Sequence, residues 1–126
     1  MILNFDSLFY YVSDLDRSVW FYRDVLGLRL VSRDGVARFD VDGVPLELVP
    51  TQQSEHYEGR GNARLCLRVD HLAAARNDLL RLGVVSSEPV DEGPGLFASI
   101  HDLDGNEIGL WQYKRSAHEP GVSMWK

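Results

Sequence analysis

The sequence predicts an α+β protein made of two βαβββ modules whose curved, mixed sheets form a cleft. Two observations predict this class: a repeat inside the chain, and the same order of apolar patterns in both halves. The stretch DVDGVPLELV at residues 40–49 reappears as DLDGNEIGLW at residues 102–111. A repeat of roughly 60 residues is long enough for a supersecondary module. The two halves can therefore be compared position by position.

Each half contains one predicted helix with a cap, an apolar stripe and a glycine stop. Ser13 caps the first helix and Gly27 ends it, while Asp70 caps the second and Gly83 ends it. Apolar residues at helical spacing predict the buried side of each helix. They are Leu15, Val19, Tyr22 and Leu26 in the first, and Leu72, Ala75, Leu79 and Leu82 in the second.

One strand-like run precedes each helix and three follow it. The runs after the helices are Leu28–Arg33, Val36–Val41, Val44–Val49, Val84–Val90, Leu96–His101 and Ile108–Gln112. Asp-Gly pairs at residues 34–35, 42–43 and 104–105 indicate turns. The whole chain is expected to be a single domain. Module one spans about residues 4–51, a polar linker 52–61, module two about 62–113 and an irregular tail 114–126.

Composition excludes several classes of partner. The formal net charge of −6 disfavours binding to a phosphate backbone, so no nucleic-acid partner is expected. No apolar run reaches the ~20 residues of a membrane helix, and residues 1–6 do not resemble a secretion signal. Cys66, the single cysteine, rules out an internal disulfide and suits a reducing compartment. We therefore expect a cytoplasmic protein without a membrane partner.

Strand alternation predicts which side chains face a ligand. In the first and last strand of each module, aliphatic side chains share one face and should pack on the helices. The other face is mixed in composition, as in a ligand cleft with apolar walls and a few polar groups. The candidate ligand-binding residues on it are Ser7, Phe9, Tyr11, Glu47, Arg64, Cys66, Arg68, Trp111 and Tyr113.

The chain resembles the vicinal oxygen chelate superfamily, which contains glyoxalase I, extradiol dioxygenases and the bleomycin-resistance proteins. The resemblance covers about residues 4–113 and lies in VSDLDRS at 12–18, FYRDVLGL at 21–28 and HDLDGNEI at 101–108. Leu103 replaces the proline of the Asp-Pro-Asp-Gly-Asn sequence usual in that superfamily. The resemblance implies a homodimer, because relatives usually pair modules across two chains.

Metal-dependent relatives take four ligands, usually His or Glu, from the cleft face. The matching positions here hold Ser7, Glu47, Arg64 and Gly109. Only Glu47 is a good ligand, whereas an arginine brings a permanent positive charge. We therefore expect no metal and no other cofactor, with Arg64 taking the place of the ion and pairing with Glu47.

The resemblance leaves two kinds of function open. The first is a metal-free binding protein of the bleomycin-resistance type, which sequesters an aromatic or antibiotic-like small molecule. The second is an enzyme, namely a lyase, an isomerase or a ring-cleaving dioxygenase. Such an enzyme would depend on a metal or would use Glu47, the candidate catalytic residue, as its base. Cys66 has no evident histidine base and is expected to be a small, half-buried thiol.

Overall fold

The computed structural model describes residues 1–2, 5–52 and 65–114 of the 126-residue chain. Within it the chain divides into two compact units. Unit 1 comprises Met1–Gly61 and Asp102–Asn106, and unit 2 comprises Asn62–His101 and Glu107–Lys126. The predicted linker beyond Gln52 and the tail beyond Lys114 lie outside the described residues. No helix among the described residues is long and apolar enough to cross a membrane.

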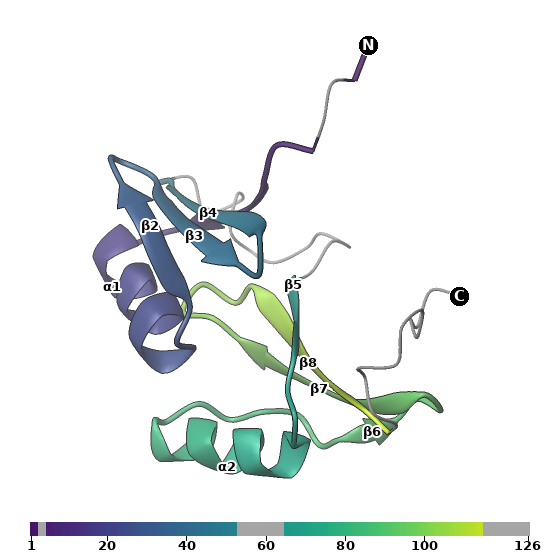
Figure 1. Cartoon of the computed structure of the whole chain (residues 1–126). Helices are drawn as coiled ribbons and strands as arrows, with labels where there is room; N and C mark the ends of the chain where they lie inside the picture. Colours follow the sequence, from purple (N-terminus) through teal and green to yellow (C-terminus); the bar gives the residue numbers. More distant parts are fainter. Residues whose placement is uncertain (3–4, 53–64, 115–126) are drawn as a thin grey trace. The chain divides into compact units, whose positions relative to one another are not determined.

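Unit 1 contains the first βαβββ module (Figure 1). Its elements are β1 (Leu8–Val12), α1 (Leu15–Trp20), the π-helix η1 (Phe21–Val25), β2 (Arg29–Arg33), β3 (Ala37–Val41) and β4 (Val44–Pro50). The strand order is β1-β4-β3-β2, with β1 parallel to β4 and the other pairs antiparallel. The turn between β3 and β4 has positive φ angles at Asp42 and Gly43, which is the hairpin geometry that Asp-Gly favours.

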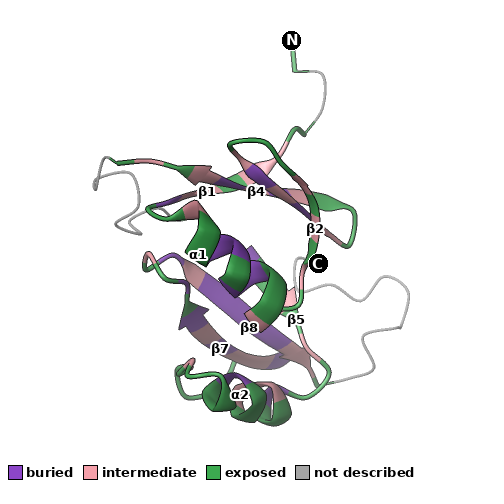
Figure 2. Ribbon diagram, turned by 90° about the vertical axis from the view of Figure 1, so that its left-hand side faces the viewer, coloured by how far each residue is buried: buried purple, intermediate pink, exposed green. Residues whose placement is uncertain are grey.

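Unit 2 repeats this topology and confirms the predicted module order. Its elements are β5 (Leu65–Arg68), α2 (Leu72–Arg81), β6 (Val90–Asp91), β7 (Gly95–His101) and β8 (Glu107–Tyr113). The strand order is β5-β8-β7-β6, with β5 parallel to β8. In both units, therefore, the first strand of the module pairs with the last strand. These last strands, β4 and β8, lie inside their sheets and carry buried residues (Figure 2).

The first helix begins one residue later than predicted and widens at its end. Asp14, not Ser13, caps it, because the Asp14 carboxylate accepts the Arg17 N–H at 3.2 Å. From Phe21 onward the turns become π-helical, with the Leu26 N–H bonding to the Phe21 carbonyl. Phe21 and Tyr22 are consequently both buried, although they are neighbours in sequence.

The N-terminus of the second helix, α2, is capped by a side chain of the sheet. His71 occupies the N-cap position without a side-chain hydrogen bond, so the predicted Asp70 cap is wrong. The Leu72 N–H donates instead to Oε1 of Gln112 on β8, at 2.6 Å. This bond places Gln112 on the side of the unit 2 sheet that faces α2.

The predicted strand Val84–Val90 is wrong for most of its length. Only Val90–Asp91 forms a ladder, with Phe97 and Leu96 as partners. Pro89 cannot donate to a ladder. The hydroxyl of Ser87 accepts a hydrogen bond from the Ser99 N–H at 2.8 Å. It takes the place of the backbone carbonyl that a ladder would use.

The turn Asp102–Asn106 joins two strands of unit 2 but belongs to unit 1. The hydroxyl of Tyr22 donates to Oδ2 of Asp102 at 2.8 Å. Nδ2 of Asn106 donates to the Tyr11 carbonyl at 3.1 Å, and the Ser13 N–H donates to Oδ1 of Asp104 at 3.1 Å. The turn is thus hydrogen-bonded to Tyr11, Ser13 and Tyr22, all residues of unit 1.

Candidate functional site

The polar and aromatic face of unit 1 is formed by β1 and β4. Phe9 lies beside Glu47 in the parallel register, and Tyr11 lies beside Val49. Leu46 and Leu48, which flank Glu47 in the sequence, are completely buried on the opposite side. The rings of Phe9 and Tyr11 meet edge to face, with centroids 5.2 Å apart. The structure thus brings together the predicted residues Phe9, Tyr11 and Glu47, with Ser7 just before β1.

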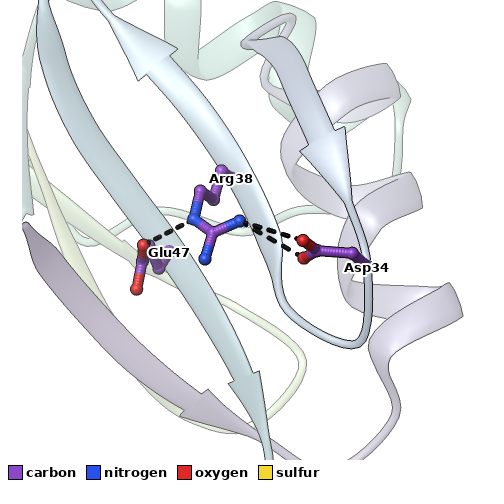
Figure 3. Close-up of polar contacts among 3 residues, drawn as sticks. All are labelled: Asp34, Arg38 and Glu47. Carbon is purple, nitrogen blue, oxygen red and sulfur yellow. Dashed lines mark hydrogen bonds and ion pairs between the residues drawn. The ribbon is translucent and has the colours of Figure 1, made fainter.

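Glu47 has a partner that the sequence did not reveal. Nε of Arg38, on β3, donates to Oε2 of Glu47 at 2.8 Å (Figure 3). Nη1 of the same guanidinium donates to Oδ1 of Asp34 at 3.2 Å. The bond to Glu47 and the negative charge of Asp34 raise the pKa of Arg38. The Glu47 carboxylate therefore forms an ion pair with Arg38, a residue of the same unit. The predicted partner, Arg64, lies outside the described residues.

The corresponding side of unit 2, here called the aromatic face, is formed by β5, β7 and β8. Its members, placed together by the strand register, are Cys66, Arg68, Gly95, Phe97, Gly109, Trp111 and Tyr113. Cys66 pairs with Gly109, and Arg68 pairs with Trp111. The face therefore unites the predicted residues of the second half other than Arg64. It also includes Phe97, which sequence reasoning did not select.

Two glycines on the aromatic face accommodate two aromatic rings. A Cβ atom at Gly109 would stand 2.8 Å from Cε1 of Phe97 and 3.2 Å from Sγ of Cys66. A Cβ atom at Gly95 would stand 2.7 Å from Cζ2 of Trp111. Each ring reaches diagonally to the neighbouring strand: Phe97 from β7 to β8, and Trp111 from β8 to β7. The two strands therefore hold each other's aromatic side chains in place.

Trp111 is buried, and its indole N–H is not satisfied. The residue is 4% exposed, and Nε1 has no hydrogen-bond partner within the described part of the chain. The indole nitrogen can only donate. A buried donor without an acceptor costs about 1–3 kcal/mol. Trp111 also meets Tyr113 edge to face at 5.7 Å, so the two rings form one aromatic surface.

Charge is distributed unevenly along the aromatic face. The guanidinium carbon of Arg68 lies 5.9 Å from the centre of the Tyr113 ring. At the other end, Glu107 pairs across strands with His101, with Nε2 and Oε1 4.0 Å apart. The face thus has a basic end on β5 and an acidic end at the start of β8.

Cys66 does not have the environment of a nucleophile. Although the residue is exposed, partial burial of its sulfur raises the pKa of the thiol. The thiolate is the reactive form, so a raised pKa keeps this sulfur protonated near neutral pH. Its sulfur lies 3.2 Å from where a Cβ atom at Gly109 would stand, a packed position that suits a small side chain.

The donor set does not fit the metal of the metal-dependent relatives. Among the described residues, no group of three or more His, Cys, Asp or Glu side chains could hold a metal ion. Of the four positions predicted to match metal ligands, Ser7 is a weak ligand, the Glu47 carboxylate is paired with Arg38 and Gly109 has no side chain, while Arg64 lies outside the described residues. The Phe97 ring fills the space that a ligand side chain at position 109 would need.

The two histidines of the described part belong to no such group either. His71 stands before α2 and His101 ends β7, while His56 and His118 lie outside the described residues. Sequence reasoning missed Arg38 and Phe97 because both stand on the third strand of a module. Extending the alternation of the last strand through the hairpin register would have placed both on the faces predicted to contact a ligand.

The chain belongs to the Glyoxalase/Bleomycin resistance protein/Dioxygenase superfamily, whose model matches residues 4–110. A lactoylglutathione lyase of Neisseria meningitidis is 29% identical over 118 residues, covering 82% of this chain and 86% of the lyase.

Two solved structures are similar as well. TnmS3, an antibiotic binding protein from Streptomyces sp. CB03234, has a TM-score of 0.69 at 26% identity, covering 90% of this chain and 99% of TnmS3. The fosfomycin resistance protein FosX from Listeria monocytogenes has a TM-score of 0.73 at 14% identity, covering 89% of this chain and 94% of FosX. The second likeness concerns the fold alone.

Proposed function

We propose that this protein binds an aromatic or antibiotic-like small molecule without a metal ion and sequesters it in a concave cleft. The supporting observation is the pair of glycine-seated rings on the aromatic face. Phe97 occupies the room of a ligand side chain at position 109, and Trp111 is fixed over Gly95. A rigid aromatic wall suits planar ligands, because aromatic rings gain from offset stacking and edge contacts.

The comparison with TnmS3 supports the same proposal. Antibiotic binding is what the name of that Streptomyces protein states, and its 26% identity extends over 90% of this chain. The candidate ligand-binding residues are those of the two ligand-facing sides: Ser7, Phe9, Tyr11, Glu47, Arg64, Cys66, Arg68, Trp111 and Tyr113. Phe97 and Arg38 join them on the geometry.

Binding can be tested by isothermal titration with bleomycin, mitomycin C, doxorubicin and the anionic novobiocin, before and after dialysis against a chelator. We expect at least one of them to bind with equal affinity in both preparations. Tyr113→Ala should weaken that binding by about tenfold, since an aromatic pair contributes about 0.5–1.5 kcal/mol. Trp20→Ala is the matched control, because Trp20 is an exposed aromatic residue on α1 of unit 1.

Three results would count against the proposal. One is the absence of binding across these ligands. Another is an equal loss of affinity in Tyr113→Ala and Trp20→Ala. The third is binding that disappears with the chelator and returns with a divalent ion, because that would assign recognition to coordination.

The alternative function is an enzyme, and one observation favours it: the 29% identity to a lactoylglutathione lyase. Glu47 is then the base, since Oε2 holds Arg38 and Oε1 stays available for a substrate proton. Arg38 would stabilise a developing oxyanion. Turnover of the hemithioacetal of methylglyoxal and glutathione that is lost in Glu47→Gln would establish this alternative.

We also propose a homodimer in the cytoplasm. Each unit has an open four-stranded sheet whose edge strands pair on one side only, namely β1 and β2 in unit 1 and β5 and β6 in unit 2. Such edges and an incomplete cleft favour pairing with a second copy. Sedimentation equilibrium at micromolar concentration should give about twice the 14.3 kDa chain mass. A monomer under these conditions would refute the dimer.

A further inference from the structure

We infer that the planar ligand of the aromatic face carries an anionic group, and that this group lies at the end marked by Arg68 and Tyr113. The inference rests on the proposed binding function and adds the charge class of the ligand. It also gives the ligand a direction along the sheet. The flat part lies over the aromatic side chains of β7 and β8, and the acid group lies towards β5.

The Arg68 guanidinium lacks the carboxylate partner that most other described arginines have. Most described arginines lie within 4.0 Å of a carboxylate: Arg23, Arg29, Arg33, Arg38, Arg76 and Arg81. Arg68 makes no such pair within the described ranges, in a chain with a formal net charge of −6. Its contact is the Tyr113 ring, which orients the group without neutralising it. The aromatic face therefore presents an uncompensated cation.

A second donor on the aromatic face also lacks an acceptor. It is the buried indole N–H of Trp111, which has no partner in the described part of the chain; the Trp111 ring lies over Gly95, on the side of β8 away from Arg68. Both groups donate and neither accepts. A carboxylate, sulfonate or phenolate on a planar ring offers several acceptor sites, so it complements donors better than an ammonium group does.

A cationic ligand is the opposing possibility, because Trp and Tyr rings also attract cations. A carboxylate that would favour it belongs to Glu107, which begins β8 and lies 4.0 Å from Nε2 of His101. Glu107 precedes Trp111 by four residues on β8, or about 13 Å at the usual rise of a strand. Exposed charges at that separation are largely screened at physiological salt. Arg68 therefore dominates the end occupied by Trp111 and Tyr113.

The test uses three probes that share one ring system and differ in charge: 2-naphthoate, 2-naphthamide and 2-naphthylmethylammonium. Titration calorimetry at low ionic strength should give affinities in that order, with naphthoate about tenfold tighter than the amide. Raising the salt concentration to 0.5 M should reduce this preference to about twofold, because salt screens the ion pair.

Arg68→Gln should remove the preference for naphthoate and leave the affinity for the amide within about twofold. The matched control is Arg81→Gln, which makes the same charge change on α2 of the same unit. Arg81 pairs with Asp78 on the helix surface, so the control should keep the full preference. Circular dichroism of both variants verifies that each is folded.

The results separate this inference from the proposed function. If the three probes bind equally, or the ammonium binds best, aromatic binding stands and the anionic assignment is wrong. The assignment is also wrong if Arg68→Gln and Arg81→Gln lose the preference equally, since net charge then explains it. If no probe binds at all, the aromatic face is not a ligand surface and both proposals fail.

Discussion

The Tyr22 hydroxyl donates a 2.8 Å hydrogen bond to Oδ2 of Asp102, a residue 80 positions further along the chain. Both groups are buried, and Nδ2 of Asn106 donates to the same carboxylate oxygen at 2.9 Å. Oδ1 of Asp102 accepts the backbone N–H groups of Asp104 and Asn106. The buried carboxylate therefore has several donors, and Tyr22 is the one contributed by the helical segment of the other half.

Removing this hydroxyl should destabilise the fold. We expect Tyr22→Phe to lower the free energy of unfolding by about 1–3 kcal/mol, because a buried charged acceptor loses a donor. Urea unfolding followed by circular dichroism measures the change. Tyr113→Phe is the control, and it should change stability by less than about 0.5 kcal/mol. Equal effects of the two substitutions would show that the Tyr22–Asp102 bond contributes nothing specific.

The same pair predicts a loss of stability in alkali. Burial and the neighbouring Asp102 raise the pKa of Tyr22 above the ordinary tyrosine value of 10.0. A group whose pKa is raised by folding contributes its full stabilisation of the folded state at pH values below its unfolded pKa. This contribution is lost as the pH rises through the folded pKa. The stability difference between the wild type and Tyr22→Phe should therefore shrink as the pH rises above 10. A difference that stays constant between pH 8 and 11 would contradict this.

Because the Phe97 ring lies over Gly109, we expect any side chain at position 109 to destabilise the fold. We expect Gly109→Ala to cost about 1–3 kcal/mol, because the new Cβ collides with Phe97. Adding Phe97→Ala should relieve part of this cost, which gives a coupling energy of at least about 0.5 kcal/mol in a double-mutant cycle. Ser99→Ala, beside Gly109 on β7, is the control. Gly109→Ala with wild-type stability would disprove the seating of the ring.

Metal affinity should be recoverable only if this ring is also removed. The pair Arg64→His and Gly109→Glu adds two donors at positions that match the ligands of metal-dependent relatives. With Phe97 in place we expect no gain, because the ring occupies the space of the new Glu side chain. Together with Phe97→Ala, calorimetric titration with Ni²⁺ should show measurable binding. Equal Ni²⁺ affinity with and without Phe97 would mean that the ring does not block the position.

Much of the fold follows from local patterns. The internal repeat and the helix stripes predict two βαβββ modules, and both sheets have the strand order that these modules require. The errors occur where a distant residue replaces a local one. Gln112 on β8, rather than Asp70, receives the first N–H of α2. The side chain of Ser87 interrupts a ladder that apolar content alone predicts between residues 84 and 90.

The candidate site was predictable only in part for the same reason. Alternation within one strand predicts the face of the sheet on which Glu47, Phe9 and Trp111 lie. It could not predict that Arg38 reaches Glu47 across the β3–β4 ladder, because that contact depends on the hairpin register. It also gave no reason to join Phe97 to Gly109, since the ring crosses diagonally to the next strand.

The turn Asp102–Asn106 also determines when the first unit can complete its folding during synthesis. A chain emerging from the ribosome folds its N-terminal parts first. Here β1 to β4 are complete at Pro50, but Tyr22 has no acceptor at Asp102 until most of the polypeptide has been synthesised. The first half of a nascent chain therefore lacks the acceptors of the Tyr22 hydroxyl and of the Ser13 N–H, which precedes α1. A fragment that stops at the linker should remain in that unfinished state.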